Sequence, residues 1–252
     1  VFLCEYTAKV QRAVLIRDYV IDHLDEAFSK GYIQVYYQPV IRSISKTLCG
    51  LEALARWIDP VYGFLKPSEF IPALENSRQL YQLDLYILEE VCKRLRACLD
   101  DGIPVVPISI NLSRMDFLTC DIFTEVERRT QKYRIPHHLL CIEITESMFV
   151  QNAQEIRIIL DHFREVGYQV WMDDFGSGYS SLNALKDYHF DELKIDMDFL
   201  SNFTQRSKDI IQSTIHMSKK IGIRTLAEGV ETEEQFRFLR DIGCEKIQGY
   251  FF

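Results

Sequence analysis

The sequence lacks the features that mark a membrane protein or a secreted protein. No apolar run approaches the ~18 residues of a membrane-spanning helix, and no signal peptide is visible. The seven cysteines are scattered, odd in number and without a Cys-x-x-Cys pair, which argues against a disulfide framework or a zinc ribbon. We therefore expect reduced thiols in a cytoplasmic segment that makes no membrane contact, although a longer parent protein could be membrane-anchored.

Basic residues are outnumbered, with 29 Lys and Arg against 37 Asp and Glu. The formal net charge is -8 and the sequence pI is about 5.3. A protein that coats long nucleic acids needs a broad basic surface to release counterions, so we expect no long nucleic acid as a partner. A small phosphate ligand stays compatible with this charge, because it needs only one or two local cations. The acidic balance also suits a site that gathers carboxylates around a metal.

Several hydrolase signatures are missing. No Gly-x-Ser-x-Gly nucleophile elbow, His-Glu-x-x-His zinc motif or His-Asp doublet occurs in the chain. The segment 175–181 contains two glycines, but it lacks the Lys-Ser/Thr ending of a P-loop. A plain loop before a helix is the better interpretation of this segment.

The composition is that of a soluble globular chain, with 47% hydrophobic and 26% charged residues. Its 252 residues suit two small domains or one α/β barrel. Residues 10–30 carry apolar side chains at helical spacing and are followed by Gly31, which predicts one amphipathic helix. A packed surface helix is the favoured interpretation, with a linker from an upstream domain or a lid on the barrel as alternatives. The sequence starts at Val1 and stops at Phe252, as an excised domain would.

Strand and helix patterns alternate from Tyr32 onward. The predicted strands are Ile33–Gln38, Leu48–Arg56, Val105–Asn111, Leu140–Thr145, Gln169–Asp173, Glu192–Ile195, Thr225–Glu228 and Lys246–Tyr250. The predicted helices between them are Leu80–Leu99, Ile122–Tyr133, Ala153–Val166, Ser180–Lys186, Asp209–Ile221 and Glu233–Ile242. This alternation implies a parallel sheet covered by helices, and eight strands indicate a (β/α)8-like barrel. Residues 41–47 are too few for a helical crossover, so the first two strands should pair antiparallel and the barrel should be a modified one.

Polar side chains fall in or just after the predicted strands, where an α/β barrel brings the strand ends together. They are Glu52, Asn111, Glu143, Asp173, Asp174, Lys194, Glu228 and Gln248. A single carboxylate in such a place is as often solvent-facing or salt-bridged as functional. Several converging carboxylates would repel one another unless cations lie between them.

The candidate metal ligands are all oxygen donors. They are Glu52, Asn111, Glu143, Asp173 and Asp174, with no His or Cys beside them. Oxygen ligands favour Mg²⁺ or Mn²⁺ over zinc or copper. The adjacent pair Asp173 and Asp174 could hold two metals with Asp173 bridging them, an arrangement suited to phosphodiester hydrolysis.

Eight ordered blocks give the chain a family resemblance over about residues 28–252. The blocks are Gln38-Pro39-Val40, Glu52-Ala53-Leu54 with Ala55-Arg56-Trp57, Asn111-Leu112-Ser113, Glu143-Ile144-Thr145-Glu146, Asp173-Asp174-Phe175-Gly176-Ser177-Gly178-Tyr179-Ser180-Ser181-Leu182, Leu193-Lys194-Ile195-Asp196, Ala227-Glu228-Gly229-Val230-Glu231 and Gln248-Gly249-Tyr250. With these blocks the chain resembles the EAL-domain cyclic di-GMP phosphodiesterases, whose signature looks like Glu52-Ala53-Leu54. The resemblance implies a modified (β/α)8 TIM-like barrel (the EAL fold) with one antiparallel strand.

The resemblance also implies roles for individual residues. Glu52, Asn111, Glu143 and Asp173 resemble the ligands of one metal, and Asp173 with Asp174 those of a second. The implied cofactor is Mg²⁺ or Mn²⁺ in a two-metal site.

Three further residues look like the catalytic groups of this family. Lys194 resembles the residue that holds the attacking water or a substrate oxygen, and Glu228 resembles the proposed general base. Glu146 looks like the residue that anchors the loop 174–181. Gln38, Arg56 and Gln248 look like substrate-binding positions, with Arg56 giving a charge-assisted contact to phosphate.

The implied activity is metal-dependent hydrolysis of cyclic di-GMP to linear 5′-pGpG in bacterial second-messenger signalling. The alternative from another class is a catalytically silent cyclic di-GMP receptor, which would bind the ligand and report it to a partner. The resemblance further implies an EAL barrel over 31–252, with 1–30 as a leader helix similar to the usual join to an upstream sensor or diguanylate cyclase (GGDEF) domain. It also makes a homodimer a candidate assembly.

Overall fold

The computed structural model of the chain describes residues 8–150, 153–176, 181–201 and 203–252. Its strands are β1 Ile33–Arg42, β2 Leu48–Asp59, β3 Gly63–Leu65, β4 Ile108–Asn111, β5 Leu140–Thr145, β6 Gln169–Phe175, β7 Glu192–Ile195, β8 Arg224–Ala227 and β9 Lys246–Ile247. Within the described residues, eight of them close into a barrel in the order β1-β9-β8-β7-β6-β5-β4-β2, and β2 pairs back to β1. The ninth strand, β3, extends β2 at one side.

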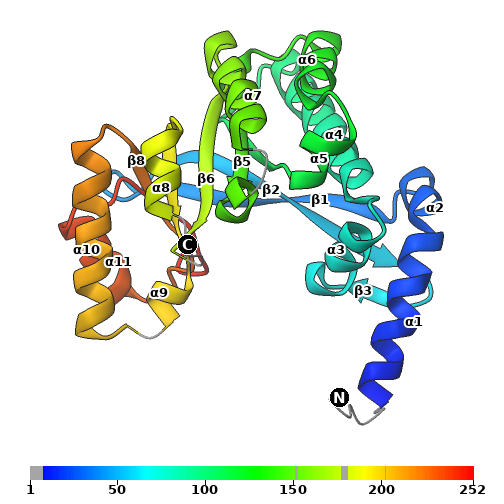
Figure 1. Cartoon of the computed structure of the whole chain (residues 1–252), viewed down its shortest axis with the longest axis horizontal. Coiled ribbons are helices and arrows are strands. Elements are labelled where there is room, and N and C mark those ends of the chain that lie inside the picture. The colour runs from blue at the N-terminus through cyan, green and yellow to red at the C-terminus, as the bar shows by residue number, and fades with distance from the viewer. Residues whose placement is uncertain (1–7, 151–152, 177–180, 202) are drawn as a thin grey trace.

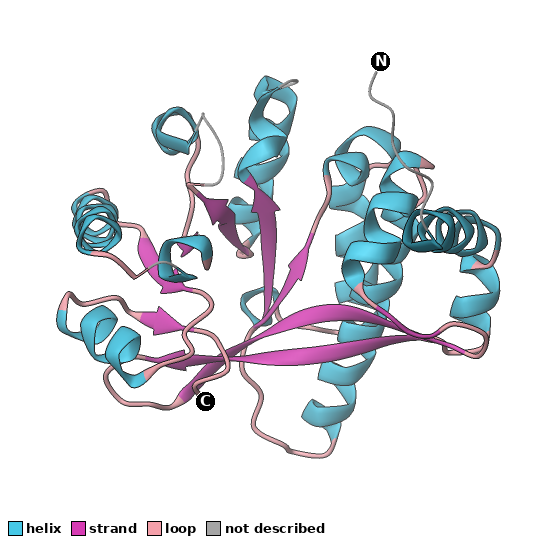
Figure 2. Cartoon of the chain, turned by 90° about the horizontal axis from the view of Figure 1, so that it is seen from below, coloured by secondary structure: helices cyan, strands magenta, loops and turns pink. Residues whose placement is uncertain are grey.

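One strand of the barrel runs against the others. β1 is antiparallel to both of its neighbours, β2 and β9, whereas the strands from β2 through β4 to β9 are parallel. Figure 2 shows β1 and β2 as two long strands that cross the molecule, with the shorter parallel strands fanned out at one end. The modified (β/α)8 barrel with one antiparallel strand is thus confirmed.

Helices surround the barrel (Figure 1). They are α1 Ala8–Asp22, α2 Leu24–Ser29, α3 Pro67–Asn76, α4 Leu80–Asp100, α5 Arg114–Thr119, α6 Ile122–Tyr133, α7 Ala153–Val166, α8 Ser181–Asp187, α9 Asp198–Ser201, α10 Gln205–Lys220 and α11 Glu233–Asp241, with 3-10 turns at His137–Leu139 and Glu146–Val150. Among the residues described, no helix combines the length and the apolar character needed to cross a bilayer.

The structure corrects the predicted helix over residues 10–30. The helix is interrupted at His23, whose backbone leaves the helical region at φ -113 and ψ 12, so α1 and α2 are separate. The His23 ring Nδ1 lies 2.8 Å from the Tyr19 carbonyl oxygen, and the ring stacks on that of Tyr19. Gly31 follows α2 with φ +71, the left-handed conformation expected of a glycine that ends a helix.

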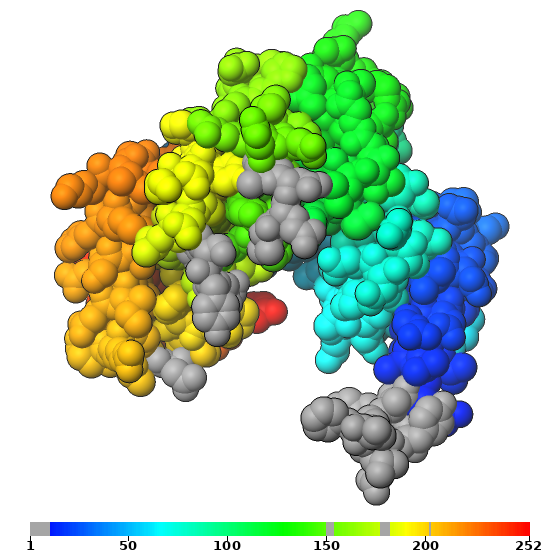
Figure 3. All heavy atoms as spheres, in the orientation of Figure 1, coloured from blue at the N-terminus to red at the C-terminus, as the bar shows by residue number. Residues whose placement is uncertain are grey.

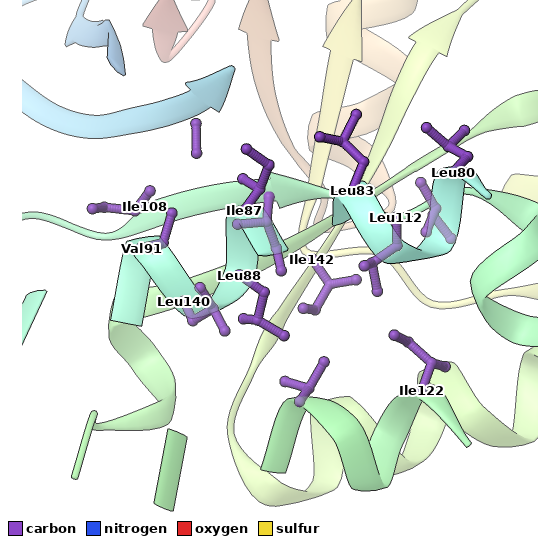
Figure 4. Packing of buried hydrophobic residues seen from close by; sticks show 14 of the residues in the cluster. Leu80, Leu83, Ile87, Leu88, Val91, Ile108, Leu112, Ile122, Leu140 and Ile142 are labelled. Carbon is purple, nitrogen blue, oxygen red and sulfur yellow. The ribbon is translucent and has the colours of Figure 1, made fainter. Parts of the chain in front are cut away.

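The main hydrophobic core lies between the barrel and the helices on one side of it. Apolar residues of α4 recur at helical spacing and bury one face of this long helix against β4, β5 and α6. Figure 4 shows the centre of this cluster, where Leu83, Ile87 and Leu88 of α4 gather with Ile108 of β4 and Leu140 of β5. This packing fixes the strand ends that carry the polar residues.

The barrel interior contains a buried ionic layer at the ends where the parallel strands begin. Lys246 Nζ lies 2.5 Å from Glu192 Oε2 and 4.5 Å from the centre of the Trp171 ring. Glu192 is fully buried, and burial raises the pKa of its carboxyl although Lys246 and Arg224 oppose this. Arg224 Nη2 donates to Gln169 Oε1 at 2.8 Å. These contacts compensate for charge that the barrel interior would otherwise leave unpaired.

We predict that Lys246→Met lowers the free energy of unfolding by roughly 3–5 kcal/mol, because Glu192 loses its close cation. The loss should be larger at about pH 8 than at about pH 5, since a carboxyl whose folded pKa lies above its unfolded pKa destabilises the fold as pH rises through that range. Urea denaturation at both pH values measures the effect. The double variant Lys246→Met with Glu192→Leu should recover part of the lost stability. A free energy of unfolding of Lys246→Met equal to that of the wild type at about pH 8 would contradict the prediction.

Candidate active site

Seven of the predicted polar residues meet at the ends where the parallel strands finish. Each comes from a different strand or from the residue just after it: Glu52 from β2, Asn111 from β4, Glu143 from β5, Asp173 from β6, Lys194 from β7, Glu228 after β8 and Gln248 after β9. Side chains in a strand alternate between its two faces, so these positions point into the barrel while their neighbours pack against the helices. The structure therefore brings together residues separated by up to 196 positions in the chain.

Lys194 lies at the centre of this group and is 1% exposed. Its Nζ is 2.8 Å from Glu143 Oε2, 3.0 Å from Glu228 Oε1 and 3.1 Å from Asp173 Oδ1. A fourth carboxylate, Glu52, is 3.5 Å away. Burial alone would lower the pKa of Lys194, but the four carboxylates raise it well above its usual value, so the amine stays charged.

Glu52 is held in place by two amides. Its Oε1 accepts from Asn111 Nδ2 at 3.2 Å, and its Oε2 accepts from Gln248 Nε2 at 2.5 Å. Burial raises the pKa of Glu52, but Lys194 and these hydrogen bonds outweigh burial and lower it overall. Glu143 is different, since burial raises its pKa well above the usual range despite the contact with Lys194.

Asp174 occupies a strained position beside Asp173. Its φ of 55° is left-handed, a conformation that costs a non-glycine residue roughly 1–2 kcal/mol and that the surrounding structure must maintain. One carboxylate oxygen from each of Asp173, Asp174 and Glu228 lies within 4.8 Å of the others. Burial, Asp173 and Asp196 raise the pKa of Asp174 to about 6.

Glu228 shares this environment. Burial, opposed by Lys194 and reinforced by Asp173 and Glu52, raises the pKa of Glu228 to about 8. The geometry thus adds Glu228 to a metal-sized carboxylate cluster, whereas the sequence predicted it as a base. It also adds Asp196, which hydrogen-bonds to Asp174. Asp196 follows Lys194 by two residues, a spacing that could have pointed to the same face of β7.

The site fits divalent cations by its charge and its donor atoms. Four carboxylates (Glu52, Glu143, Asp173 and Glu228) surround the ammonium of Lys194, and a fifth, Asp174, lies in a cluster with Asp173 and Glu228. The formal excess is four negative charges, which two divalent cations would neutralise. Within the described residues, the buried atoms Glu143 Oε1 and Gln248 Oε1 also lack a hydrogen-bond partner. Oxygen atoms of this kind are the ligands that Mg²⁺ and Mn²⁺ prefer.

A pocket of about 310 Å³ opens beside the carboxylates. It is lined by Gln38, Glu52, Leu54, Asp173, Met197, Glu228, Gly229, Glu231, Gln248, Gly249 and Tyr250. Figure 3 shows the hollow on this side of the molecule, between the blue and cyan segments and the yellow and orange ones, with red C-terminal atoms at its edge. Gly249 is needed in the wall, because a Cβ atom there would meet the backbone of Val230 at 2.2 Å.

The remaining predicted residues lie at different distances from the pocket. Gln38 lines it opposite Glu52, its partner in the β1–β2 register. Arg56 is outside the lining, where its guanidinium donates to the Ala55 carbonyl and lies 5.7 Å from the centre of the half-exposed Tyr36 ring.

Glu146 is buried directly after β5, at the start of a 3-10 turn. Much of the loop that Glu146 is predicted to anchor, residues 177–180, lies outside the described residues.

Comparisons with known proteins place this arrangement in a family. A family model described as the EAL domain matches residues 21–252. The oxygen sensor protein DosP of Escherichia coli is 35% identical over 231 residues, which cover 91% of this chain and 29% of DosP. MucR of Pseudomonas aeruginosa, named a bifunctional diguanylate cyclase and cyclic di-GMP phosphodiesterase, is 32% identical over 92% of this chain and 34% of its own length. The chain therefore spans about a third of the length of these curated relatives.

The solved structure of the PaMucR phosphodiesterase in complex with c-di-GMP is similar to this one. It has a TM-score of 0.86 and 31% sequence identity, and the match covers 92% of this chain and 95% of that one. Because the family model spans most of the chain and the barrel agrees with this relative, the chain belongs to the EAL-domain family, whose named members include cyclic di-GMP phosphodiesterases.

Proposed function

We propose that this chain is an active phosphodiesterase that hydrolyses one phosphodiester bond of cyclic di-GMP to give linear 5′-pGpG. The observation that carries the proposal is the convergence of four carboxylates around Lys194, with Asp174 beside two of them, next to a pocket of about 310 Å³. Such a group would be unfavourable as a purely structural feature, because buried like charges repel. It suits a site where cations and a phosphodiester enter together.

The metal ligands in this proposal are Glu52, Asn111, Glu143, Asp173 and Asp174. Mg²⁺ or Mn²⁺ in such a site supplies charge that polarises a phosphoryl oxygen and makes water easier to deprotonate. Asp173 is the residue best suited to serve two cations, since it contacts Lys194 on one side and lies in a cluster with Asp174 and Glu228 on the other.

Glu228 and Lys194 would handle the proton and the charge of the reaction. The pKa of Glu228 is raised to about 8, which makes its carboxylate a stronger base than an ordinary glutamate, and bound cations would favour the deprotonated form that accepts a proton from the attacking water. Water adds to phosphorus, the bond from phosphorus to the 3′ oxygen breaks, and the 3′ oxygen leaves as a hydroxyl once protonated. Lys194, which stays charged, orients the water or a substrate oxygen through its Nζ.

Substrate recognition would use groups on the pocket wall and at its mouth. Gln38 and Gln248 offer amide groups inside the pocket. Arg56 supplies a cation for a phosphate, and Tyr36 beside it offers an exposed aromatic face. We further propose that the domain works within a longer protein, since the matched relatives extend well beyond it and MucR is named as bifunctional.

The direct test is incubation of the purified chain with cyclic di-GMP and Mg²⁺, Mn²⁺, Ca²⁺ or EDTA. We expect linear pGpG, followed by chromatography, with Mg²⁺ and Mn²⁺ and none with EDTA, because the carboxylate cluster needs cations before a phosphodiester can approach it. Equal product formation with EDTA would contradict metal dependence.

A parallel titration of cyclic di-GMP separates activity from binding. If cyclic di-GMP binds but no product forms under any metal condition, the proposal of an enzyme is wrong and the chain is a catalytically silent receptor. Neither product nor binding would remove cyclic di-GMP as the ligand of this pocket.

A further inference from the structure

A second pocket lies on the outer face of the β1–β2 pair, away from the carboxylates. It has a volume of about 240 Å³ and lies between the two strands, α4 and the segment that leads into β4. Its wall is formed mainly by apolar side chains from these three parts, among them Leu51, Leu95, Val105 and Ile108. Figure 4 shows Ile108 where β4 passes α4. The size is just below that of drug-sized ligand pockets, so the pocket suits a small ligand.

Two polar groups at this pocket have no partner in the described part of the chain. The Tyr37 side chain is only partly buried, and its hydroxyl makes no hydrogen bond to a described residue. Arg94 is exposed on α4, and no described carboxylate lies within ion-pair distance of it. Both side chains line the pocket, where burial raises the pKa of Tyr37 to about 12 and the Arg94 guanidinium opposes this rise.

The surrounding charges leave Arg94 available for an anion. Glu90, one helical turn before Arg94, is engaged with Lys93 at 2.6 Å. Arg96, on the other side, pairs with Asp100 at 2.7 Å. The mouth of the pocket therefore offers one uncompensated guanidinium and one phenolic O–H, above an apolar interior.

We infer that this second pocket binds a small carboxylate with a short apolar chain. The carboxylate would accept hydrogen bonds from Arg94 and Tyr37, and the chain would occupy the space lined by Leu51, Leu95 and Ile108. A guanidinium favours carboxylates through charge-assisted hydrogen bonds, and an apolar chain gains free energy by leaving water. The inference stands apart from hydrolysis, because none of its residues belongs to the catalytic pocket.

The position of the pocket also connects it with the catalytic pocket. Tyr37 and Leu51 face outward, and the residues that follow them, Gln38 and Glu52, face the catalytic pocket from the same two strands. A ligand in the second pocket would touch the outer side of this sheet segment while the substrate touches its inner side. The two ligands would be separated by a single layer of backbone.

The test is isothermal titration of the chain with octanoate, octanol and octylammonium, three probes that share one apolar chain and differ in charge. Octanoate should bind most tightly and octylammonium least. Arg94→Gln should weaken octanoate binding roughly tenfold and leave octanol unchanged, because a hydrogen bond to a charged group is lost. Arg157→Gln removes an exposed arginine of α7 and should change nothing.

The reactivity of Cys98 provides a second measurement of binding at this pocket, since its side chain is part of the lining and its thiol is free. Octanoate should slow the alkylation of Cys98 by iodoacetamide, measured by peptide mass spectrometry, in the wild type but not in Arg94→Gln. Cys98→Phe should fill the pocket and abolish binding of both octanoate and octanol. Equal binding of the three probes, or octanoate binding that survives Cys98→Phe in a folded protein, would overturn the inference.

Discussion

Asp173→Asn is expected to reduce hydrolysis of cyclic di-GMP roughly a thousandfold, which corresponds to about 4 kcal/mol of transition-state stabilisation. Asp173 contacts Lys194 at 3.1 Å and belongs to the cluster with Asp174 and Glu228. The substitution keeps the size and one oxygen of the side chain but removes its charge, so cations should bind much more weakly. The rate of pGpG formation at saturating Mn²⁺ measures the effect, and a titration with Mn²⁺ measures the loss of affinity.

The matched control is Asp161→Asn, which removes an exposed carboxylate from α7 with the same change of atoms. It should hydrolyse cyclic di-GMP at the wild-type rate. Circular dichroism should show both variants folded. Turnover near the wild-type rate in Asp173→Asn would remove this residue from the metal site and with it the proposed arrangement of cations.

Lys194→Met is expected to abolish activity and to destabilise the fold in the absence of metal. Among the described residues, Lys194 is the cation that contacts these four carboxylates, and its removal leaves them to repel one another in the barrel interior. Breaking a buried charge network in this way costs roughly 3–5 kcal/mol, which lowers the melting temperature of a domain of this size by roughly 6–20 °C. Thermal unfolding in EDTA measures the loss.

Divalent cations should recover part of this stability, because they supply positive charge where Lys194 did. Mn²⁺ should therefore raise the melting temperature of Lys194→Met more than that of the wild type. Lys186→Met, on the exposed side of α8, is the control and should have the melting temperature of the wild type in both EDTA and Mn²⁺. Equal melting temperatures for Lys194→Met and the wild type in EDTA would show that the carboxylates do not depend on this lysine.

The barrel strands could be predicted closely from the sequence where they are buried on both faces. Leu140–Thr145 and Glu192–Ile195 have the predicted bounds in the structure, because each is a short segment of mainly apolar or β-branched residues between loop residues, which leaves little choice of where the strand begins and ends. The antiparallel pairing of β1 with β2 was predictable as well, since the connection is short.

Other elements follow from tertiary contacts that a local pattern does not contain. α3 carries Pro72 within ten residues, and β3 has only three residues that exist as a strand because β2 lies beside them. The strand β4 begins at Ile108 rather than Val105, directly after Pro107, which has no backbone N–H to donate to a ladder. Short elements of this kind gain their stability from neighbours rather than from propensity.

For the site, the sequence indicated which side chains would come together but not which of them would form ion pairs with one another. That Lys194 would contact four carboxylates from separate strands depends on the diameter and closure of the barrel. The cluster of Glu228 with Asp173 and Asp174 depends on the left-handed backbone at Asp174. The residue type at this position does not indicate that conformation, because it is not a glycine. The metal-ligating and catalytic roles of these residues stay predictions until the variants are measured.

The closure of the barrel by β9 has a consequence for synthesis. β1 pairs with β9 through Ile41–Ile247 and Arg42–Lys246. β1 is the first barrel strand to leave the ribosome, so it cannot complete its pairing until β9 has also emerged. Until then the nascent chain holds two open sheet edges, a state that favours association with other chains and slow folding. Glu52 likewise receives its hydrogen bond from Gln248 only at that point. In a nascent copy of this domain the carboxylate site should therefore stay incomplete until β9 and Gln248 have emerged.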